Sequence, residues 1–233
     1  MRGGREEGGV RPYYDEGGIA IYHGDCLDVL PALDLARVGV IVGDPPYGVG
    51  LNQQDGRLAK DAAKVYGDDK PYDPAPLLAL GLPMVLWGAN AYADRLPASR
   101  GWLVWDKTHA DTCQHSQAEL AWASWGGGIR MHREAYHGFM RARDGWLHPT
   151  QKPVALYLWI YAQRRFPATG AILDPYLGAG ASLLAAKQLG RRAIGIEIEE
   201  RYCEIAARRL AQGVLDLGGS SGAVPGVQGG LGL

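Results

Sequence analysis

The chain has 233 residues, of which 47% are hydrophobic and 21% are charged, and its formal net charge is −1. A sequence of this size and composition is expected to form one globular domain with its own core, without a disulfide framework. Because the net charge is nearly zero, any attraction to a polyanion has to come from a local cluster of basic residues. The three cysteines (Cys26, Cys113 and Cys203) are widely spaced, which favours a reducing, cytoplasmic setting.

The sequence also disfavours a membrane protein and a metalloprotein. The longest apolar stretch without charge, residues 77–93, is interrupted by glycine and proline, and the N-terminus lacks the apolar segment of a signal peptide. We therefore expect no membrane attachment. His109, Cys113 and His115 lie close together, but no fourth ligand stands at zinc spacing, so we expect a surface loop and no metal there.

The first half of the chain predicts strands separated by short helices. Residues 1–17 are rich in glycine and charge and are expected to form an arm or loop. The apolar run at 38–42 predicts a buried strand of a parallel sheet, and the polar residues 48–69 predict a long loop. The other expected elements are a strand at 19–22, a helix at 26–35 with Asp25 as its N-cap, a helix at 74–80, a strand at 84–87, a short helix at 91–96 and strands at 102–105 and 120–123.

The second half continues the alternation. The expected elements are a helix at 154–166 opened by Pro153, a strand at 171–173, a helix at 181–189, a strand at 192–196 and a helix at 200–212. Residues 213–233 consist mainly of glycine and small side chains and are expected to be a disordered tail. Strands that alternate with helices predict an α/β fold with a doubly wound, mostly parallel sheet over residues 18–212.

The strand at 38–42 leads into Asp44, Pro45, Pro46 and Tyr47. One carboxylate, one aromatic ring and backbone carbonyls whose direction two prolines restrict form a small, rigid group. Such a group suits a planar ring that bears an exocyclic amino group. By itself, this stretch is also compatible with a proline-rich turn after a strand.

A second group of residues suits a nucleoside. Gly178 and Gly180 lie between an expected strand and an expected helix, where they let the backbone approach a ligand closely. Glu197 ends the next strand, where an acid can accept hydrogen bonds from both hydroxyls of a ribose. The same glycines are also compatible with a turn that only allows tight packing of the helix on the strand.

The type of nucleoside can be narrowed. A dinucleotide-binding GxGxxG motif has a third glycine where this chain has Leu183, and the Asp174 carboxylate would repel a pyrophosphate. These residues disfavour an NAD-dependent oxidoreductase. An ammonium group would be attracted to Asp174, and S-adenosylmethionine carries an ammonium, a carboxylate, a sulfonium and a ribose but no phosphate.

Two further segments carry polar groups of interest. Residues 148–153 (His-Pro-Thr-Gln-Lys-Pro) offer the Thr150 hydroxyl and the Lys152 ammonium to a carboxylate, or form a surface turn before a helix. Residues 129–143 mix basic side chains with aromatic ones and methionine. This mixture suits phosphate contact and base stacking, and it is equally typical of a solvated loop.

In this order, the three motifs resemble those of the β class of DNA amino-methyltransferases: DPPY, then HPTQKP, then the glycine motif of the methyl-donor site. The likeness covers about residues 19–210. Tyr176 and Ala179 are mild departures from the family's DPFxGSG pattern, and Ala181 replaces the first Thr that follows it. It implies the Rossmann-like fold of S-adenosylmethionine-dependent methyltransferases, in one domain with a small target-recognition insertion at 126–147. It also implies that residues 44–47 are catalytic.

The resemblance further implies the binding residues. S-adenosylmethionine would be bound by Asp25, Cys26, Thr150, Lys152, Asp174, Pro175, Tyr176, Gly178, Gly180, Ser182, Glu197 and Ile198. DNA would be bound by Arg130, Arg133, Arg141 and Arg143. Many relatives form dimers, and the sequence does not say whether this chain does or whether it has a restriction partner. The likeness implies a bacterial or phage-encoded, cytoplasmic protein.

The implied reaction is direct, in-line methyl transfer to the exocyclic amino nitrogen of a flipped base, without a metal. Asp44 would orient that nitrogen as an acceptor, and Tyr47 would stack on the base. In this family DPPY more often accompanies N6-adenine and SPPY N4-cytosine, so we expect adenine, with cytosine as the alternative. A non-catalytic nucleic-acid-binding module is a third interpretation. Protein glutamine methyltransferases share a related NPPY motif, but they have Asn at the position of Asp44, which disfavours that class.

Overall fold

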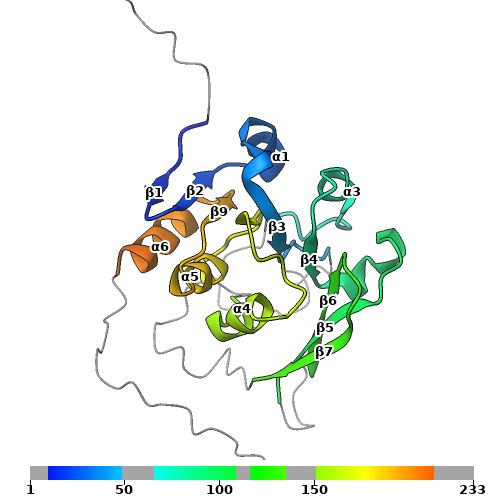
Figure 1. Ribbon diagram of the computed structural model, residues 1–233. Helices are drawn as coiled ribbons and strands as arrows, with labels where there is room; N and C mark the ends of the chain where they lie inside the picture. Colours follow the sequence, from blue (N-terminus) through cyan, green and yellow to red (C-terminus); the bar gives the residue numbers. More distant parts are fainter. Residues whose placement is uncertain (1–9, 49–65, 109–115, 135–150, 213–233) are drawn as a thin grey trace, which may run out of the picture.

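The computed structural model describes residues 10–48, 66–108, 116–134 and 151–212 (Figure 1). Within these ranges the strands form one nine-stranded sheet with the order β1-β2-β9-β8-β3-β4-β6-β5-β7. The strands are β1 (Tyr14–Glu16), β2 (Ile19–His23), β3 (Val38–Gly43), β4 (Met84–Trp87), β5 (Gly101–Asp106), β6 (Ala118–Ala123), β7 (Gly128–Arg133), β8 (Ala171–Asp174) and β9 (Ala193–Glu197).

Helices cover both faces of this sheet, as the doubly wound fold requires. The α-helices are α1 (Cys26–Val29), α3 (Ala75–Leu78), α4 (Val154–Tyr161), α5 (Ala181–Gln188) and α6 (Glu200–Ala211). Short 3-10 helices are η1 (Leu30–Ala32), η2 (Leu35–Arg37), η3 (Ala89–Ala91) and η4 (Ala93–Arg95). In Figure 1, α4, α5 and α6 gather on one side of the sheet, and α1 and α3 lie on the other.

The predicted mostly parallel sheet is confirmed. Strands β2, β9, β8, β3 and β4 run parallel to one another, and β6 is antiparallel to both of its neighbours, β4 and β5. From β3 the chain winds outward to β4, whereas from β8 it winds the other way to β9. The winding therefore changes direction between β3 and β8, and ligands of such sheets bind beyond the carboxyl ends of the strands at this point.

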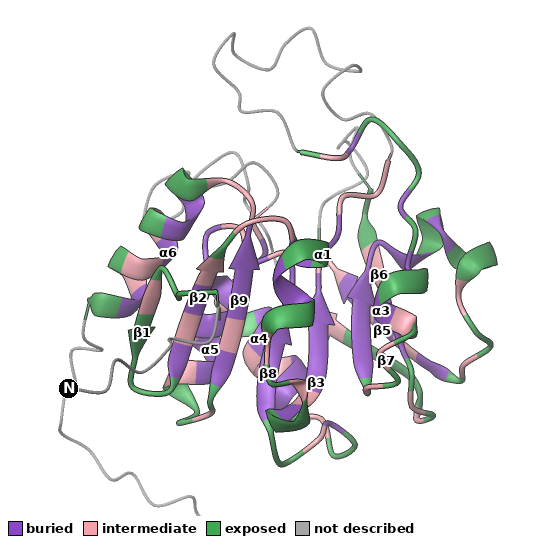
Figure 2. Cartoon of the chain, turned by 90° about the horizontal axis from the view of Figure 1, so that it is seen from above, coloured by how far each residue is buried: buried purple, intermediate pink, exposed green. Residues whose placement is uncertain are grey.

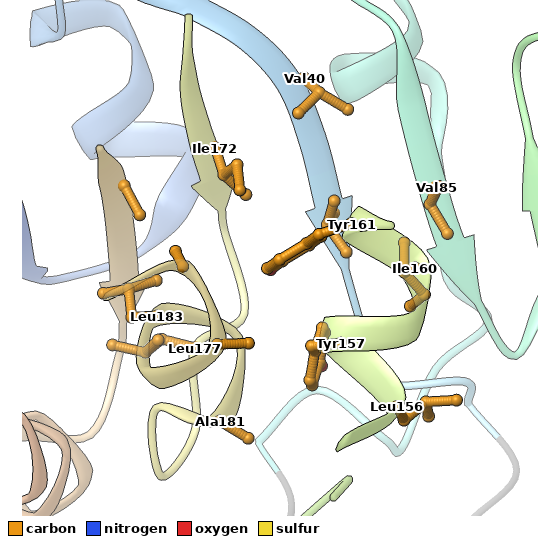
Figure 3. Packing of buried hydrophobic residues seen from close by; sticks show 14 of the residues in the cluster. Val40, Val85, Leu156, Tyr157, Ile160, Tyr161, Ile172, Leu177, Ala181 and Leu183 are labelled. Carbon is orange, nitrogen blue, oxygen red and sulfur yellow. The ribbon is translucent and has the colours of Figure 1, made fainter. Parts of the chain in front are cut away.

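The core consists of one apolar layer on each face of the sheet. On the α4–α5–α6 face, Val40 of β3 and Ile172 of β8 pack with Ile160 of α4 and Leu183 of α5, and all four side chains are fully buried (Figure 3). The other layer lies under α1 and α3 and includes Leu77. The central strands are buried along most of their length (Figure 2), which is why their sequences are nearly continuous apolar runs.

Most expected elements are present, and the differences have local causes. Asp25 caps α1 as predicted, because its Oδ1 accepts a hydrogen bond from the Leu27 amide at 2.9 Å. The helix expected at 26–35 is wrong in extent: the α-helix stops at Val29 and continues as η1, whose second residue, Pro31, has no amide hydrogen. Likewise, α4 ends at Tyr161 and does not reach residue 166.

Two strands form where the sequence predicted none. Strand β1 lies inside the stretch expected to be an arm, and it pairs antiparallel with β2. Strand β7 lies inside the basic segment and pairs parallel with β5 at the edge of the sheet. Both are short or edge strands with little burial, so their sequences lack the apolar signal of the central strands. The other loop and tail predictions fall on residues 1–9, 49–65, 109–115, 135–150 and 213–233, which lie outside the described residues.

In the part of the chain that the structure describes, no helix combines the length and apolar character needed to cross a membrane. Across the same residues, no group of three or more His, Cys, Asp or Glu side chains could hold a metal ion.

The central position of β8 leads to a prediction about stability. Ile172→Ala should lower the free energy of unfolding by about 2–5 kcal/mol, because it leaves a cavity in the fully buried layer between β8 and the helices. Ile129→Ala is the matched control, since this isoleucine on β7 is 68% exposed, and it should cost less than about 1 kcal/mol. Urea unfolding followed by circular dichroism measures both. Equal losses would contradict the proposed core.

Candidate active site

The two motifs singled out in the sequence meet at the carboxyl edge of the sheet. Strand β3 leads into residues 44–47, the DPPY motif, and its neighbour β8 leads into residues 175–180, here called the glycine turn. Both motifs line one cavity of about 450 Å³. Residues 66–73 and the start of the segment before α4 complete its wall. The cavity lies at the change of winding direction, where the fold is expected to bind ligands.

Most of the residues expected to bind the donor line this cavity. Apart from Lys152, which is described below, they are Asp25, Cys26, Pro175, Tyr176, Gly178, Glu197 and Ile198. They come from the loop after β2, the glycine turn after β8 and the end of β9, three parallel strands whose carboxyl ends lie together. The sheet therefore brings together residues that are far apart in the sequence.

Glu197 organises the glycine turn. Its Oε2 accepts a hydrogen bond from the Gly178 amide at 2.7 Å, and its Oε1 accepts one from the Glu199 amide at 2.9 Å. Gly178 has φ of +53°, a conformation that favours glycine. Burial raises the pKa of the Glu197 carboxyl, although the two amides stabilise its charged form. A carboxylate bonded twice to backbone keeps a fixed position at the cavity wall.

Asp174, Ser182 and Gly180 lie behind the wall. The Asp174 side chain was expected to meet the ammonium of the donor, but it is 1% exposed and does not line the cavity. Its Oδ1 accepts a hydrogen bond from the Tyr176 amide at 3.0 Å, and its Oδ2 accepts one from the Ser182 hydroxyl. Gly180 has φ of +84°, and a Cβ there would lie 2.8 Å from the Cβ of Ala206 on α6. All three residues hold the turn in shape.

Asp44 and Tyr47, which also line the cavity, contact each other. The Tyr47 hydroxyl donates a hydrogen bond to Asp44 Oδ1 at 2.6 Å, and the Asp44 side chain is 14% exposed. Burial raises the pKa of Asp44, even though a nearby ammonium favours its charged form. The DPPY carboxylate lines the cavity and keeps part of its surface exposed there.

The ammonium beside Asp44 belongs to Lys152. The sequence analysis expected Lys152 to meet the donor carboxylate, but its Nζ forms an ion pair with Asp44 Oδ2 and lies 3.1 Å from the Tyr47 hydroxyl. Its side chain is only 3% exposed. The ring of Trp87 lies under the same ammonium, 5.4 Å from it. Lys152 thus belongs to the DPPY side of the cavity.

Sequence reasoning missed two charged residues of this site, Glu119 and Lys107. Glu119 lies near the start of β6, with its Oε2 3.2 Å from the Nζ of Lys152 and 3.4 Å from the Tyr47 hydroxyl. Its Oε1 lies 2.6 Å from the Nζ of Lys107. Although burial opposes ionisation, the two lysines lower the pKa of Glu119 to about 2. Asp44 and Glu119 together raise the pKa of Lys152 despite its burial.

The Tyr47 ring occupies a place that only a glycine opposite it allows. Gly88, directly after β4, has φ of +67°, and a Cβ there would lie 2.0 Å from Cε1 of Tyr47. The ring therefore rests against the backbone at the end of β4. This contact fixes the ring beside Asp44 and the cavity.

The residues expected to bind DNA are placed only in part. Arg130 and Arg133 are exposed on β7, at the edge of the sheet, where Arg133 Nε lies 2.9 Å from Asp106 Oδ2. Arg141, Arg143 and Thr150 lie outside the described residues.

Comparisons with known proteins identify the family of the chain. The model of the N6/N4 methyltransferase family, described as DNA methylase, matches residues 86–208. The chain therefore belongs to this DNA methylase family. The match includes Glu119, Lys152 and the glycine turn, but it begins after the DPPY motif.

Curated relatives support the assignment. A type II methyltransferase, M2.LlaDCHI from Lactococcus lactis subsp. cremoris, is 26% identical over 88% of this chain and 95% of the relative. Another, M.ScaI from Streptomyces caespitosus, is 25% identical over 86% of this chain and 84% of the relative. The chain is therefore a DNA methyltransferase of the N6/N4 family, and the base that it modifies is a separate question.

Two solved structures share the fold. The M1.HpyAVI–SAM complex has a TM-score of 0.51 and 24% identity, and the alignment covers 82% of this chain and 99% of that one. The cytosine-N4-specific PvuII DNA methyltransferase has a TM-score of 0.60 and 14% identity over 91% of this chain and 92% of that one. At these identities, the likeness concerns the fold.

The contact between Gly88 and Tyr47 leads to a prediction about activity. Gly88→Ala should lower the rate of DNA methylation at least about tenfold, because the new methyl group displaces the Tyr47 ring from Asp44. Gly81→Ala is the matched control: φ there is +66°, yet nothing lies within 4 Å of the added Cβ. Transfer of a labelled methyl group to DNA is measured for both variants. Equal rates in the two variants would contradict the role of the close contact.

The burial of Asp174 leads to a prediction about pH. Burial raises the pKa of Asp174 to about 7. Since the folded protein then binds this proton more tightly than the unfolded chain, the wild type should lose stability as pH rises from about 4 to about 7. Asp174→Asn does not titrate, so its stability relative to wild type should rise across this window by about 4 kcal/mol, about 3 pH units at about 1.4 kcal/mol each.

Urea unfolding at several pH values measures this difference, with Asp34→Asn at an exposed aspartate as a control for the loss of a carboxylate. Parallel stability curves for wild type and Asp174→Asn would show that burial of Asp174 does not shift its proton binding.

Proposed function

We propose that the chain is a site-specific DNA methyltransferase that modifies the exocyclic N6 of adenine. The observation that carries this proposal is the shared cavity, in which the Asp44 carboxylate faces the same space as Glu197 and the glycine turn. A group that can accept from an amino nitrogen and a wall suited to a nucleoside therefore border one volume. Membership of the DNA methylase family supplies the reaction class.

The methyl donor is S-adenosylmethionine, which supplies an electrophilic methyl group; a fold neighbour, M1.HpyAVI, was solved in complex with it. The residues present fit this molecule. Glu197 is suited to the ribose hydroxyls, Asp25 lies at the same wall, and Tyr176 presents an aromatic ring to the cavity. The Gly178 backbone, free of a side chain, lets a ligand lie close to the turn.

Asp44 is proposed to orient the target amino group. An exocyclic amino nitrogen is conjugated with its ring, so its lone pair is a weak nucleophile. A hydrogen bond from this amino group to Asp44 holds the nitrogen in a geometry that frees the lone pair, and alignment supplies much of the rate. Tyr47, packed on Gly88, is placed to stack on the base. In duplex DNA the base must first leave the helix, which costs a few kcal/mol.

DNA is proposed to approach from the end of the sheet formed by β5, β6 and β7. Arg130 and Arg133 are exposed there, and residues 126–147, the proposed target-recognition segment, begin at this edge. Basic side chains at such an edge suit phosphate contacts that position the duplex without reading its sequence.

N4-cytosine is the second candidate. The PvuII enzyme, named as cytosine-N4-specific, shares the fold over most of both chains, so this fold serves that chemistry as well. The Asp at position 44, where N4-cytosine enzymes of the resembled class more often carry Ser, favours adenine in this chain.

The experiment that tests the proposal is expression in a bacterial host without DNA methylation, followed by digestion of the DNA to nucleosides and mass spectrometry. We expect N6-methyladenine with the wild type. N4-methylcytosine would replace the first candidate by the second, and neither base from folded, donor-binding protein would contradict DNA methylation.

Asp44→Ala is predicted to abolish the methylated nucleoside, a loss of at least about a hundredfold, because the amino group loses its orienting acceptor. Donor affinity, measured by isothermal titration calorimetry, should stay within about threefold of wild type, since Asp44 takes no part in the hydrogen bonds of Glu197 that shape the glycine turn. Glu197→Ala should instead weaken donor binding, because the ribose hydroxyls of the donor lose an acceptor.

A further inference from the structure

Four charged side chains are packed beside the cavity, and the mechanism above uses only one of them. Asp44 and Glu119 are the carboxylates, and Lys152 and Lys107 are the ammonium groups. Their side chains are between 3% and 22% exposed. Charges with so little access to water are stable only while they are paired, so the position of each depends on the others.

Lys152, which contacts both carboxylates, competes with the target amino group for Asp44. Its ammonium pairs with Asp44 Oδ2, the carboxylate to which the target amino group is to bind. The target nitrogen also gains positive charge as it takes up a methyl group, and a lysine ammonium at the same carboxylate opposes that charge. Productive binding of the base therefore requires the Lys152 ammonium to move away from Asp44. Because this ammonium is buried, it needs another carboxylate as its counter-ion when it moves.

Glu119 supplies that second counter-ion. Its Oε2 already lies 3.2 Å from the Nζ of Lys152, so the ammonium can transfer its pairing with a small movement. The same oxygen lies 3.4 Å from the Tyr47 hydroxyl, which gives the tyrosine a second acceptor as well. The other oxygen of Glu119, Oε1, lies 2.6 Å from the Nζ of Lys107, so the two lysines share this carboxylate.

We infer that Glu119 is a positioning residue for methyl transfer: it takes over Lys152 when the target amino group binds to Asp44. Lys107 has the opposite influence, because its charge competes with Lys152 for the same carboxylate. This inference rests on the proposed function and deepens it, by adding a second carboxylate on β6 that keeps the first one available.

The inference predicts opposite effects for two substitutions. In Glu119→Gln, Lys152 has Asp44 as its only charged partner among the described residues and stays on it, so the single-turnover rate at saturating donor should fall about tenfold or more. In Lys107→Met, the charge of Glu119 is left to Lys152, so the rate should equal or exceed that of wild type. A cluster that only stabilises the fold would make both variants slower.

The experiment measures single-turnover methylation of DNA, donor affinity by calorimetry and thermal unfolding for the wild type and each variant. Glu204→Gln is the matched control, because this glutamate is an exposed helix residue paired with Arg208. Glu119→Gln should keep donor affinity within about twofold, so that the loss lies in the rate and not in binding. Glu119→Asp keeps the negative charge, so its rate should fall less than that of Glu119→Gln.

Each outcome decides between the possibilities. A Glu119→Gln variant as fast as the wild type would overturn the inference while the proposed function stands. Equal losses of rate in Glu119→Gln and Lys107→Met would also overturn it, since they would mark a structural cluster. If Glu119→Gln does not fold, Lys107→Met still tests the inference, because a rate below that of wild type in this variant would overturn it. Absence of methylation by the wild type itself would overturn the proposed function, and the inference with it.

Discussion

The ion pair between Lys152 and Asp44 is the interaction on which the arrangement of the site depends. It joins the end of β3 to the segment before α4, and Glu119 extends it to β6. Removal of one partner of a buried pair typically costs about 3–5 kcal/mol, because the other charge is left uncompensated. The pair therefore brings together three segments that are distant in sequence, and the DPPY side of the cavity takes its shape from their meeting.

The donor side of the cavity is built differently. Its wall is held by backbone amides that donate to carboxylates, at Glu197 and, one layer deeper, at Asp174. These bonds join residues at and just after the ends of β8 and β9, and neither Lys152 nor Glu119 takes part in them. The two groups of residues come together where the neighbouring strands β3 and β8 end. This separation is why substitutions at Asp44 and at Glu197 are expected to affect different steps.

The fold could be predicted largely from the sequence because its central strands are buried on both faces. The runs at 38–42 and 171–173 are apolar without interruption. Asp25 is a favoured N-cap residue and directly precedes α1, so the start of this helix could also be predicted. Strand β7 could not be predicted, because at the sheet edge its side chains are mostly exposed and basic, which is also what a loop shows.

The site was predicted in its motifs but not in its contacts. Asp44 and Tyr47 could be identified because the DPPY motif directly follows β3, and Glu197 because it ends β9. Glu119 could not, since it is a lone glutamate near the start of a strand, and its importance depends on which side chains the fold brings to it. Asp174 shows the converse: its sequence position suggested a ligand contact, but burial directs its oxygens to Tyr176 and Ser182. Tertiary packing decides both cases.

The most direct measurement is a crystal structure of the protein with a non-reactive donor analogue and DNA that contains its target base. The account predicts that the exocyclic amino group donates to Asp44 while the Lys152 ammonium has moved onto Glu119, with Tyr47 stacked on the base. A base bound with Lys152 still paired to Asp44, or an amino group that bonds elsewhere, would contradict it.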